Sequence, residues 1–296
     1  MHLVKNFFAV VLLSLSVSAN AANADNDVDM QEDGIKLDKP SIWSRLAPAQ
    51  QIEAQAQQQY LGLKSQAQQQ GALVADNDPQ VLRLRRIAKL LIPFAQRWND
   101  KAQQWQWEVN LIDSPQMNAF CMPGGKIAFY TGILKTLKLN DDEVAMVMGH
   151  EIAHALREHG RERVAKNMAL RLGAAVTSSV LGLGHTGQTL VGQGAQLAML
   201  KFSRGDESEA DLVGLDIAAR AGFDPRAGIA LWQKMSLVNK KAPPQWLSTH
   251  PAGENRIAEI RKHLPEVMPL FVKAKNLDGA SLPPYKSNVK SLAPIL

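Results

Sequence analysis

The stretch GHEIAH at residues 149–154 decides how the rest of the chain is interpreted. Two histidines four residues apart in a helix lie about 40° apart around its axis and about 6 Å apart along it. His150 and His154 are therefore expected to face the same way, so that one divalent metal ion can bind a nitrogen of each. Glu151 is expected beside the ion, where a general base takes a proton from the attacking water. Since the motif fixes only three residues, its surroundings must support it.

The residues on either side predict a helix around this motif. Asn140 is followed three residues later by Glu143, which is the pattern of a capping box and marks a helix start. The helix is expected to run to His159 and to end at Gly160, because glycine is favoured just after a helix. A second helix is expected from Arg161 onward.

Upstream of this helix, the spacing of the apolar residues changes to every second residue, which predicts a small sheet. Large apolar residues alternate with polar ones over residues 105–111, as in a half-buried strand. Residues 117–122 and 126–130 are expected to form two more strands around the Pro-Gly-Gly turn at 123–125. The sequence therefore predicts an α+β fold that is mainly helical, with a small antiparallel sheet beside the HExxH helix. Other helices are expected at residues 49–70, 79–94, 206–221, 225–238 and 254–264.

The two ends of the chain are expected to lie outside the folded core. Residues 1–21 have the charged start, apolar run and A-x-A end of a secretory signal, cleaved after Ala21 or, alternatively, after Ala24. An uncleaved anchor is the competing interpretation, although the apolar run is short for a membrane span. Residues 22–45 are expected to form a flexible acidic leader, and residues 266–296 a loosely attached tail.

Residues 172–200 contain no Asp, Glu, Lys or Arg. A membrane span is one interpretation of this segment. Its many glycines and polar residues favour instead a mobile helix–loop–helix lid over the active site. No membrane span is therefore expected in the mature chain.

Composition excludes several classes of protein. The net charge is +5, but the basic residues are scattered along the 296-residue chain, so no nucleic acid is expected as a partner. The one cysteine, Cys121, excludes a disulfide-stapled domain and a cysteine-rich zinc module. A hydrophobic fraction of 46% is ample for a core.

A catalytic zinc usually takes three protein ligands and leaves one position for water, so two histidines need a partner. The pattern HExxHxxGxxH, which supplies a third histidine, is absent because Arg157 and Gly160 occupy the positions of its glycine and last histidine. Other HExxH enzymes take a glutamate from a later helix. Glu207 is in such a position, and Asp211, one turn further on, is placed to hold the second ring nitrogen of a ligand histidine.

Three further motifs resemble those of one family. Residues 203–211, SRGDESEAD, resemble the SRxxExxAD signature of the CAAX-prenyl-endopeptidase and HtpX-like zinc metallopeptidases. NAF at residues 118–120 followed by PGG at 123–125 is similar to that family's hairpin, and THP at 249–251 with Arg256 is similar to its downstream element. The chain is most similar to the periplasmic branch typified by BepA and LoiP.

The resemblance implies a gluzincin-type metallopeptidase domain over residues 46–265, with one zinc ion per chain. It implies an endopeptidase of periplasmic quality control, with unfolded or misassembled envelope proteins as substrates and the outer-membrane assembly machinery as a further partner. The residues that it assigns are the zinc ligands His150, His154 and Glu207, the base Glu151, and Asp211, which positions a ligand.

Substrate is expected to extend along the strand at residues 117–122, at Asn118, Ala119 and Phe120, and to add to the sheet through backbone hydrogen bonds. Arg256 is assigned to substrate binding, although it could instead pair with a carboxylate near the site or cap local structure. His250, expected on a loop, has three open roles: a fourth zinc ligand that gates the site, a donor to the oxyanion, or a structural residue.

The competing function is a periplasmic chaperone or assembly adaptor that binds unfolded clients with little cleavage. The complete set of ligands with a base disfavours it, because a protein that only binds has no use for Glu151. The two roles could also coexist in one protein.

The other histidines and acidic residues near these motifs are expected to take no part in the site. Glu209 lies on a different helix face from Glu207 and is expected to be solvated. His159, His185 and His263 are expected at the surface or in loops.

Overall fold

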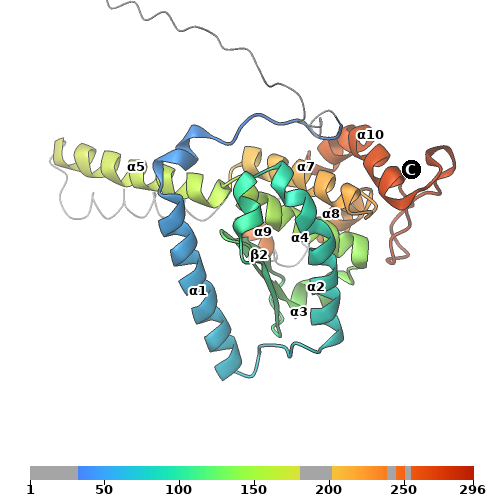
Figure 1. The fold of residues 1–296 in the computed structure, drawn as a ribbon, viewed down its shortest axis with the longest axis horizontal. Helices are drawn as coiled ribbons and strands as arrows, with labels where there is room; N and C mark the ends of the chain where they lie inside the picture. The colour runs from blue at the N-terminus through green and yellow to red at the C-terminus, as the bar shows by residue number, and fades with distance from the viewer. Residues whose placement is uncertain (1–32, 181–201, 239–244, 251–254) are drawn as a thin grey trace, which may run out of the picture. The chain divides into compact units, whose positions relative to one another are not determined.

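Helices dominate the described part of the chain, which covers residues 33–180, 202–238, 245–250 and 255–296 in this computed structural model (Figure 1). The α-helices are α1 (Ala49–Gln69), α2 (Pro79–Leu91), α3 (Thr131–Leu137), α4 (Asp141–Leu156), α5 (His159–Val180), α7 (Arg204–Arg220), α8 (Ala227–Val238), α9 (Gln245–Thr249) and α10 (Arg256–Lys275). The short 3-10 helices are η1 (Ile42–Leu46), η2 (Ile92–Arg97), η3 (Asp100–Gln104) and η4 (Gly279–Ser281). The predicted α+β class is confirmed.

The sheet has three strands, β1 (Glu108–Ile112), β2 (Ala119–Met122) and β3 (Lys126–Tyr130), in the order β1-β3-β2. β2 and β3 form the predicted antiparallel hairpin, but β1 and β3 run parallel, so the sheet is mixed and not antiparallel throughout. The cause is the connection at residues 113–118, which carries β2 one strand position away from β1 and leaves the place between them to β3.

Helix α4 carries the HExxH motif through the centre of the protein. It contacts β2, α2, α7 and α8, and every residue from Glu143 to Leu156 is buried. Its start is the predicted capping box, in which Asn140 and Glu143 each accept a hydrogen bond from the other's backbone N–H. A helix that is buried on all sides holds its side chains rigidly, which suits a site that needs fixed geometry.

The end of α4 differs from the prediction. The helix stops at Leu156, and the break comes at Glu158, whose backbone is left-handed with a φ of 58°. Gly160 lies inside α5, so the predicted stop at this glycine was wrong. The early break places His159 beside His154 of α4.

Helices α4 and α7 cross in backbone contact at two glycines. A Cβ added to Gly149 would lie 2.9 Å from the carbonyl oxygen of Gly214, and one added to Gly214 would lie 2.8 Å from the backbone nitrogen of His150. Neither position therefore has room for a side chain. This close approach places the first turn of α7 over the two histidines of α4.

The C-terminal segment is not the loosely attached tail expected from residue 266. Helix α10 continues through Pro265 and Pro269 to Lys275, because its buried apolar positions recur at helical spacing beyond the first proline. After it, Tyr285 is buried and its hydroxyl accepts a hydrogen bond of 2.8 Å from the side chain of Asn140. The segment thus packs on the start of α4.

The described part of the expected leader, from residue 33, also packs against the folded core. Ile35 is 2% exposed, and its backbone N–H donates to Asp216 Oδ2 at 3.1 Å. Gly34 has a φ of +84° and passes so close to Asp216 that a Cβ would clash. The flexible leader predicted to reach residue 45 is therefore wrong from residue 33 onward.

Two predictions fall mainly on residues that the structure does not describe. The signal at residues 1–21 lies outside the described residues, as does 181–201, which includes most of the predicted lid. Within the described ranges, no helix has both the length and the apolar character that crossing a bilayer requires.

The helix crossing gives a first prediction. Gly214→Ala should lower the free energy of unfolding by about 1–3 kcal/mol, because the added methyl group forces two backbones apart. Denaturant unfolding measures it. Gly62→Ala in α1 is the matched control, since no described atom lies within 4 Å of its Cβ position, and it should be neutral or slightly stabilising. Equal effects of the two substitutions would contradict the tight crossing.

Candidate metal centre

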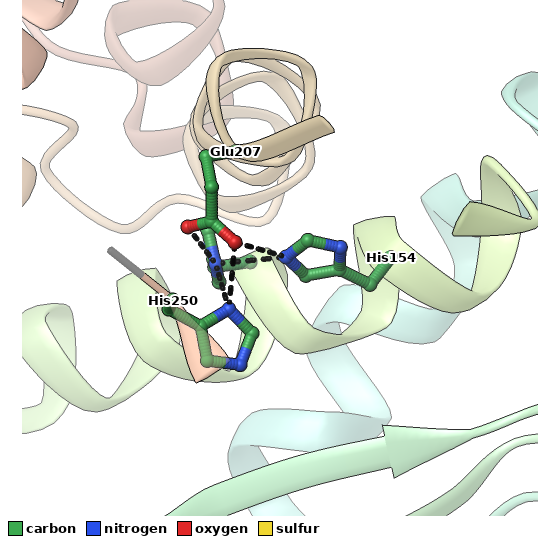
Figure 2. A group of neighbouring side chains, drawn as sticks. His154, Glu207 and His250 are labelled. Atoms are coloured by element: carbon green, nitrogen blue, oxygen red, sulfur yellow. Dashed lines mark hydrogen bonds and ion pairs between the residues drawn. The ribbon is translucent and has the colours of Figure 1, made fainter. Parts of the chain in front are cut away.

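Four buried side chains converge where α7 crosses α4 (Figure 2). His150 and His154 come from α4, Glu207 from the first turn of α7, and His250 directly follows α9. One ligand-type atom from each lies within 4.8 Å of the other three. All four residues are at most 3% exposed. The structure thus brings together the three residues predicted as ligands and adds His250 to them.

The distances within this group fit a tetrahedral metal ion. Donor atoms bound to one tetrahedral zinc at about 2.05 Å are about 3.3 Å apart. His150 Nε2 is 3.1 Å from His154 Nε2 and 3.2 Å from His250 Nδ1. The carboxylate of Glu207 lies 3.0 Å from His250 Nδ1, 3.5 Å from His154 Nε2 and 3.6 Å from His150 Nε2. Five of the six pairs of groups are therefore close to the expected separation, with Oε1 of Glu207 facing His154 and His250 and its Oε2 facing His150.

The chemistry of the donors points to the same conclusion. Three imidazole nitrogens and a carboxylate are the donor types that zinc accepts in proteins. Lone pairs of neighbouring imidazoles repel at about 3 Å unless a proton or a cation lies between them. A zinc ion in the middle of the group would satisfy all of them at once, so the residues fit the metal.

The ring orientation of His150 is set by a carboxylate, as predicted. His150 Nδ1 lies 3.1 Å from Asp211 Oδ1, which leaves its Nε2 to face the centre. Asp211 is held in turn by Arg256, whose Nε and Nη2 donate to its two oxygens at 2.6 and 2.5 Å. Arg256 also donates to Glu207.

This position corrects the assignment of Arg256 to substrate binding. Its guanidinium is buried behind the cluster and lies 3.9 Å from the ring centre of Trp232. It therefore neutralises the two carboxylates Asp211 and Glu207 from the side opposite the cleft, which is one of the alternatives that the sequence left open.

Mutual charge interactions keep the carboxylates ionised in this buried place. Burial alone would raise the pKa of Glu207, but hydrogen bonds with His154 and His250 outweigh it and hold that pKa far below its ordinary value. Burial likewise raises the pKa of Asp211, and the charge of Arg256 with the hydrogen bond to His150 lowers it overall. Both groups are thus anionic and able to bind or orient a cationic centre at neutral pH.

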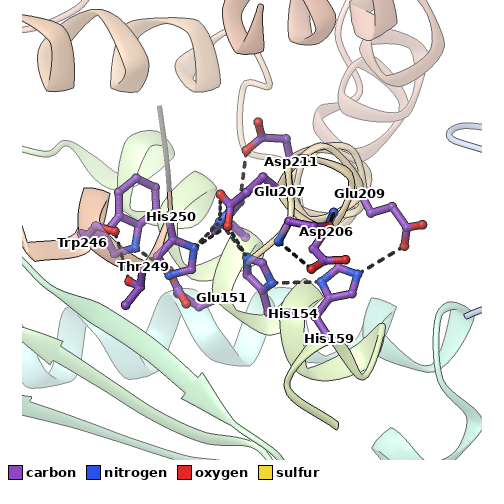
Figure 3. Close-up of polar contacts among 12 residues, drawn as sticks. Glu151, His154, His159, Asp206, Glu207, Glu209, Asp211, Trp246, Thr249 and His250 are labelled. Carbon is purple, nitrogen blue, oxygen red and sulfur yellow. Dashed lines mark hydrogen bonds and ion pairs between the residues drawn. The ribbon is translucent and has the colours of Figure 1, made fainter. Parts of the chain in front are cut away.

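Glu151 lies beside the cluster and points into the cleft, where a base is required (Figure 3). Its Oε1 accepts a hydrogen bond of 2.6 Å from Trp246 Nε1 and lies 3.6 Å from His250 Nε2. The indole of Trp246 also stacks on the imidazole of His250, with ring centres 4.8 Å apart. Sequence reasoning missed Trp246, although its spacing of one helical turn before His250 was a usable signal.

His250 is not on the free loop that was expected. Its backbone N–H donates to the carbonyl of Trp246 at 2.8 Å, so it caps α9. Phe202 was also missed; its ring stacks on His154 with centres 3.9 Å apart, and its N–H donates to the carbonyl of Thr249. These contacts attach α9 to both the metal ligands and the start of α7.

A cleft of about 470 Å³ opens onto Glu151, His154 and His250. Its walls are β2, α1 and the first turns of α5, and the lining includes Asn118, Ala119 and Phe120, the residues that the sequence assigned to substrate binding. β2 is the edge strand of the sheet among the described strands, and its residues line the cleft. An extended peptide laid along that edge would pass beside Glu151.

Two residues expected at the surface are part of the site. His159 is 3% exposed and contacts His154, and Glu209 is bonded to His159. His263, by contrast, lies on α10 and pairs with Glu266, away from the metal centre, as expected. His185 lies outside the described residues.

Comparisons with known proteins agree with this geometry. The family described as peptidase family M48 matches residues 80–264. Metalloendopeptidase OMA1 of Danio rerio, a mitochondrial protein, is 33% identical over 213 residues, or 67% of this chain and 44% of the relative. OMA1 of Arabidopsis thaliana is 40% identical over 150 residues, covering 51% and 30%. The β-barrel assembly-enhancing protease of Yersinia pestis is 29% identical over 171 residues, covering 54% and 35%.

The chain therefore spans between about a third and a half of the length of these relatives. The matched segment contains the HExxH motif, Glu207 and His250. The family and the printed names of the relatives support a metalloendopeptidase.

The buried charges around Arg256 give a second prediction. Arg256→Gln should lower the free energy of unfolding by about 3–5 kcal/mol, because it leaves two buried carboxylates without their counter-charge. Arg261→Gln, on the exposed side of the same helix, is the control and should change it by at most about 0.5 kcal/mol. If denaturant unfolding gave similar values for both variants, the neutralising role of Arg256 would be wrong.

Proposed function

This chain belongs to peptidase family M48, and on that premise we propose that it is a zinc-dependent endopeptidase that cleaves misfolded or stalled envelope proteins in the periplasm. The observation that carries the proposal is the tetrahedral group of His150, His154, Glu207 and His250 with Glu151 beside it. A protein that only bound clients would need neither a metal centre nor a carboxylate placed next to one.

In this proposal His150, His154 and Glu207 hold the zinc ion. When bound, the ion acts as a Lewis acid, which makes the attacking water more acidic and stabilises negative charge on the carbonyl oxygen of the substrate. The protein contributes the rigidity of the site. The ligands lie on two helices in backbone contact, so they need not reorganise during the reaction.

Glu151 is the general base. The indole N–H of Trp246 engages its Oε1 and fixes the plane of the carboxylate, which leaves Oε2 to accept the proton of the attacking water. The same carboxyl group then delivers this proton to the leaving amine. Its position, buried beside the ligands but lining the cleft, supports this double role.

Substrate binds in extended form along the edge strand β2, at Asn118, Ala119 and Phe120. Backbone hydrogen bonds to this edge recognise any unfolded chain, whereas folded proteins have no free extended segment to offer. The cleft wall opposite is α1, which presents Ile52, Gln55 and Gln59. This mixed lining supports loose sequence specificity.

The cellular setting rests on two observations. Residues 1–21 have the pattern of a secretory signal, which supports export and, in a bacterium, the periplasm. One relative is named a β-barrel assembly-enhancing protease, which supports membership of the BepA- and LoiP-like branch and the outer-membrane assembly machinery as a partner. The OMA1 relatives are mitochondrial by name, so this setting is our proposal.

His250 is proposed to gate the centre. Its Nδ1 occupies the fourth corner of the tetrahedron, where the attacking water must bind. With α9 in this position, His250 fills the coordination position that the attacking water needs, so the site is closed to catalysis. A site closed in this way also supports the alternative function of a chaperone or adaptor that binds clients with little cleavage.

A third prediction tests the base. Glu151→Gln should lower the rate of casein cleavage by at least about 10²-fold and leave the zinc content unchanged, because Gln keeps the shape of the side chain but cannot accept the proton. Glu266→Gln, which changes an exposed carboxylate of α10 away from the cleft, is the control and should retain activity. Cleavage by Glu151→Gln within about tenfold of the unaltered protein would exclude Glu151 as the base. Client binding without cleavage by the unaltered protein would favour the chaperone.

A fourth prediction tests the gate. His250→Ala should raise basal proteolysis and self-cleavage, because it empties the fourth corner for water. Gel assays of casein and of the protein itself measure this, with His263→Ala as a control away from the centre. A lower rate would indicate a donor to the oxyanion, and an unchanged rate a structural histidine; either result would contradict the gate.

A further inference from the structure

His159 is a buried histidine that the catalytic scheme above does not use. It is 3% exposed and lies at the first position of α5. The left-handed backbone of Glu158 turns it back toward α4, and its Nδ1 comes within 2.9 Å of His154 Nδ1. Figure 3 shows its ring between His154 and Glu209.

The orientation of His154 toward the metal centre decides which ring nitrogen of each histidine carries hydrogen in this contact. His154 faces the other ligands with Nε2, so that nitrogen must be free of hydrogen to bind a metal ion. Its Nδ1 then carries the hydrogen and donates a hydrogen bond to His159 Nδ1. His159 must therefore carry its own proton on Nε2, which lies 3.3 Å from Glu209 Oε2.

Glu209 completes the chain as a carboxylate. The Nε of Arg157 donates to Glu209 at 2.8 Å, and its Nη2 donates to the carbonyl of Asp38 at 2.5 Å. Every donor in the series thus points toward the anionic end.

The two histidines of the HExxH motif are consequently supported in parallel ways. His150 is held by Asp211, which is paired with Arg256. His154 is held through one additional imidazole by a carboxylate that is also paired with an arginine. A carboxylate behind a ligand histidine fixes its tautomer and makes the opposite nitrogen a stronger donor.

From this arrangement we infer that His159, which is hydrogen-bonded to Glu209, is the positioning residue of His154. It accepts a hydrogen bond from Nδ1–H of His154 and so keeps Nε2 available for the metal ion. This inference rests on the zinc site of the proposed function. His159 touches neither the ion nor the substrate, so its effect is on zinc affinity first and on catalysis through it.

The experiment measures zinc affinity directly, by competition with a chromophoric chelator, in the full-length protein. His159→Leu fills the space but removes the acceptor, and should weaken zinc binding by about 10–100-fold. His159→Asn places an oxygen where Nδ1 was, and should stay within about threefold of the unaltered protein. His263→Leu removes a histidine–glutamate pair elsewhere and is the control.

Two further measurements separate positioning from simple packing. Cobalt substituted for zinc reports ligand geometry in its visible spectrum, which should change in His159→Leu and be restored in His159→Asn. Glu209→Gln, at a half-exposed position, should weaken zinc binding by about three- to tenfold. This variant keeps the test valid if His159→Leu fails to fold.

Unchanged zinc affinity in both His159→Leu and Glu209→Gln would overturn the inference, as would equal losses in the Leu and Asn variants. These results leave the proposed function intact if His150→Ala still abolishes zinc binding. A protein that binds no zinc at all would instead overturn the proposed function, and the inference with it.

Discussion

The structure depends on the crossing of α4 and α7 at Gly149 and Gly214. The backbones touch there, one residue before His150, so no side chain separates the two helices. Both helices have alanines four residues before and after these glycines, which gives each a narrow row of small side chains on one face. Because of this approach, a carboxylate from the first turn of α7 reaches two imidazoles on α4 although 53 residues separate it from the second one in the sequence.

A second constraint follows from the burial that the crossing produces. Imidazoles and carboxylates that are nearly inaccessible to water need a partner at each polar atom, since an unpaired buried group costs several kcal/mol. The protein meets this need with two arginines behind the cluster, Arg256 and Arg157, each paired with a carboxylate that is bonded to a histidine. The many charged side chains around the centre are thus a consequence of keeping the ligands ionised and correctly oriented in a site that excludes water.

Sequence alone was sufficient for the part of the site that has local signatures. The spacing in HExxH and the capping box at Asn140 follow from helix geometry, and Glu207 was assigned through the resemblance of residues 203–211 to a family signature. The structure brings His150, His154 and Glu207 together. His159 could not be found in this way, because α4 ends at Leu156 and the left-handed residue after it, Glu158, is not a glycine. The parallel pairing of β1 with β3 and the continuation of α10 past Pro265 depend on tertiary packing, which outweighs turn and proline signals.

We propose that the crossing of α4 and α7 builds one zinc site. A crystal structure of the purified protein, with data collected on both sides of the zinc absorption edge, tests it most directly. We expect one anomalous peak per chain, at about 2.0–2.2 Å from His150 Nε2, His154 Nε2 and a carboxylate oxygen of Glu207. Absence of a peak between these three atoms in zinc-replete protein, or zinc bound instead by other residues, would contradict it.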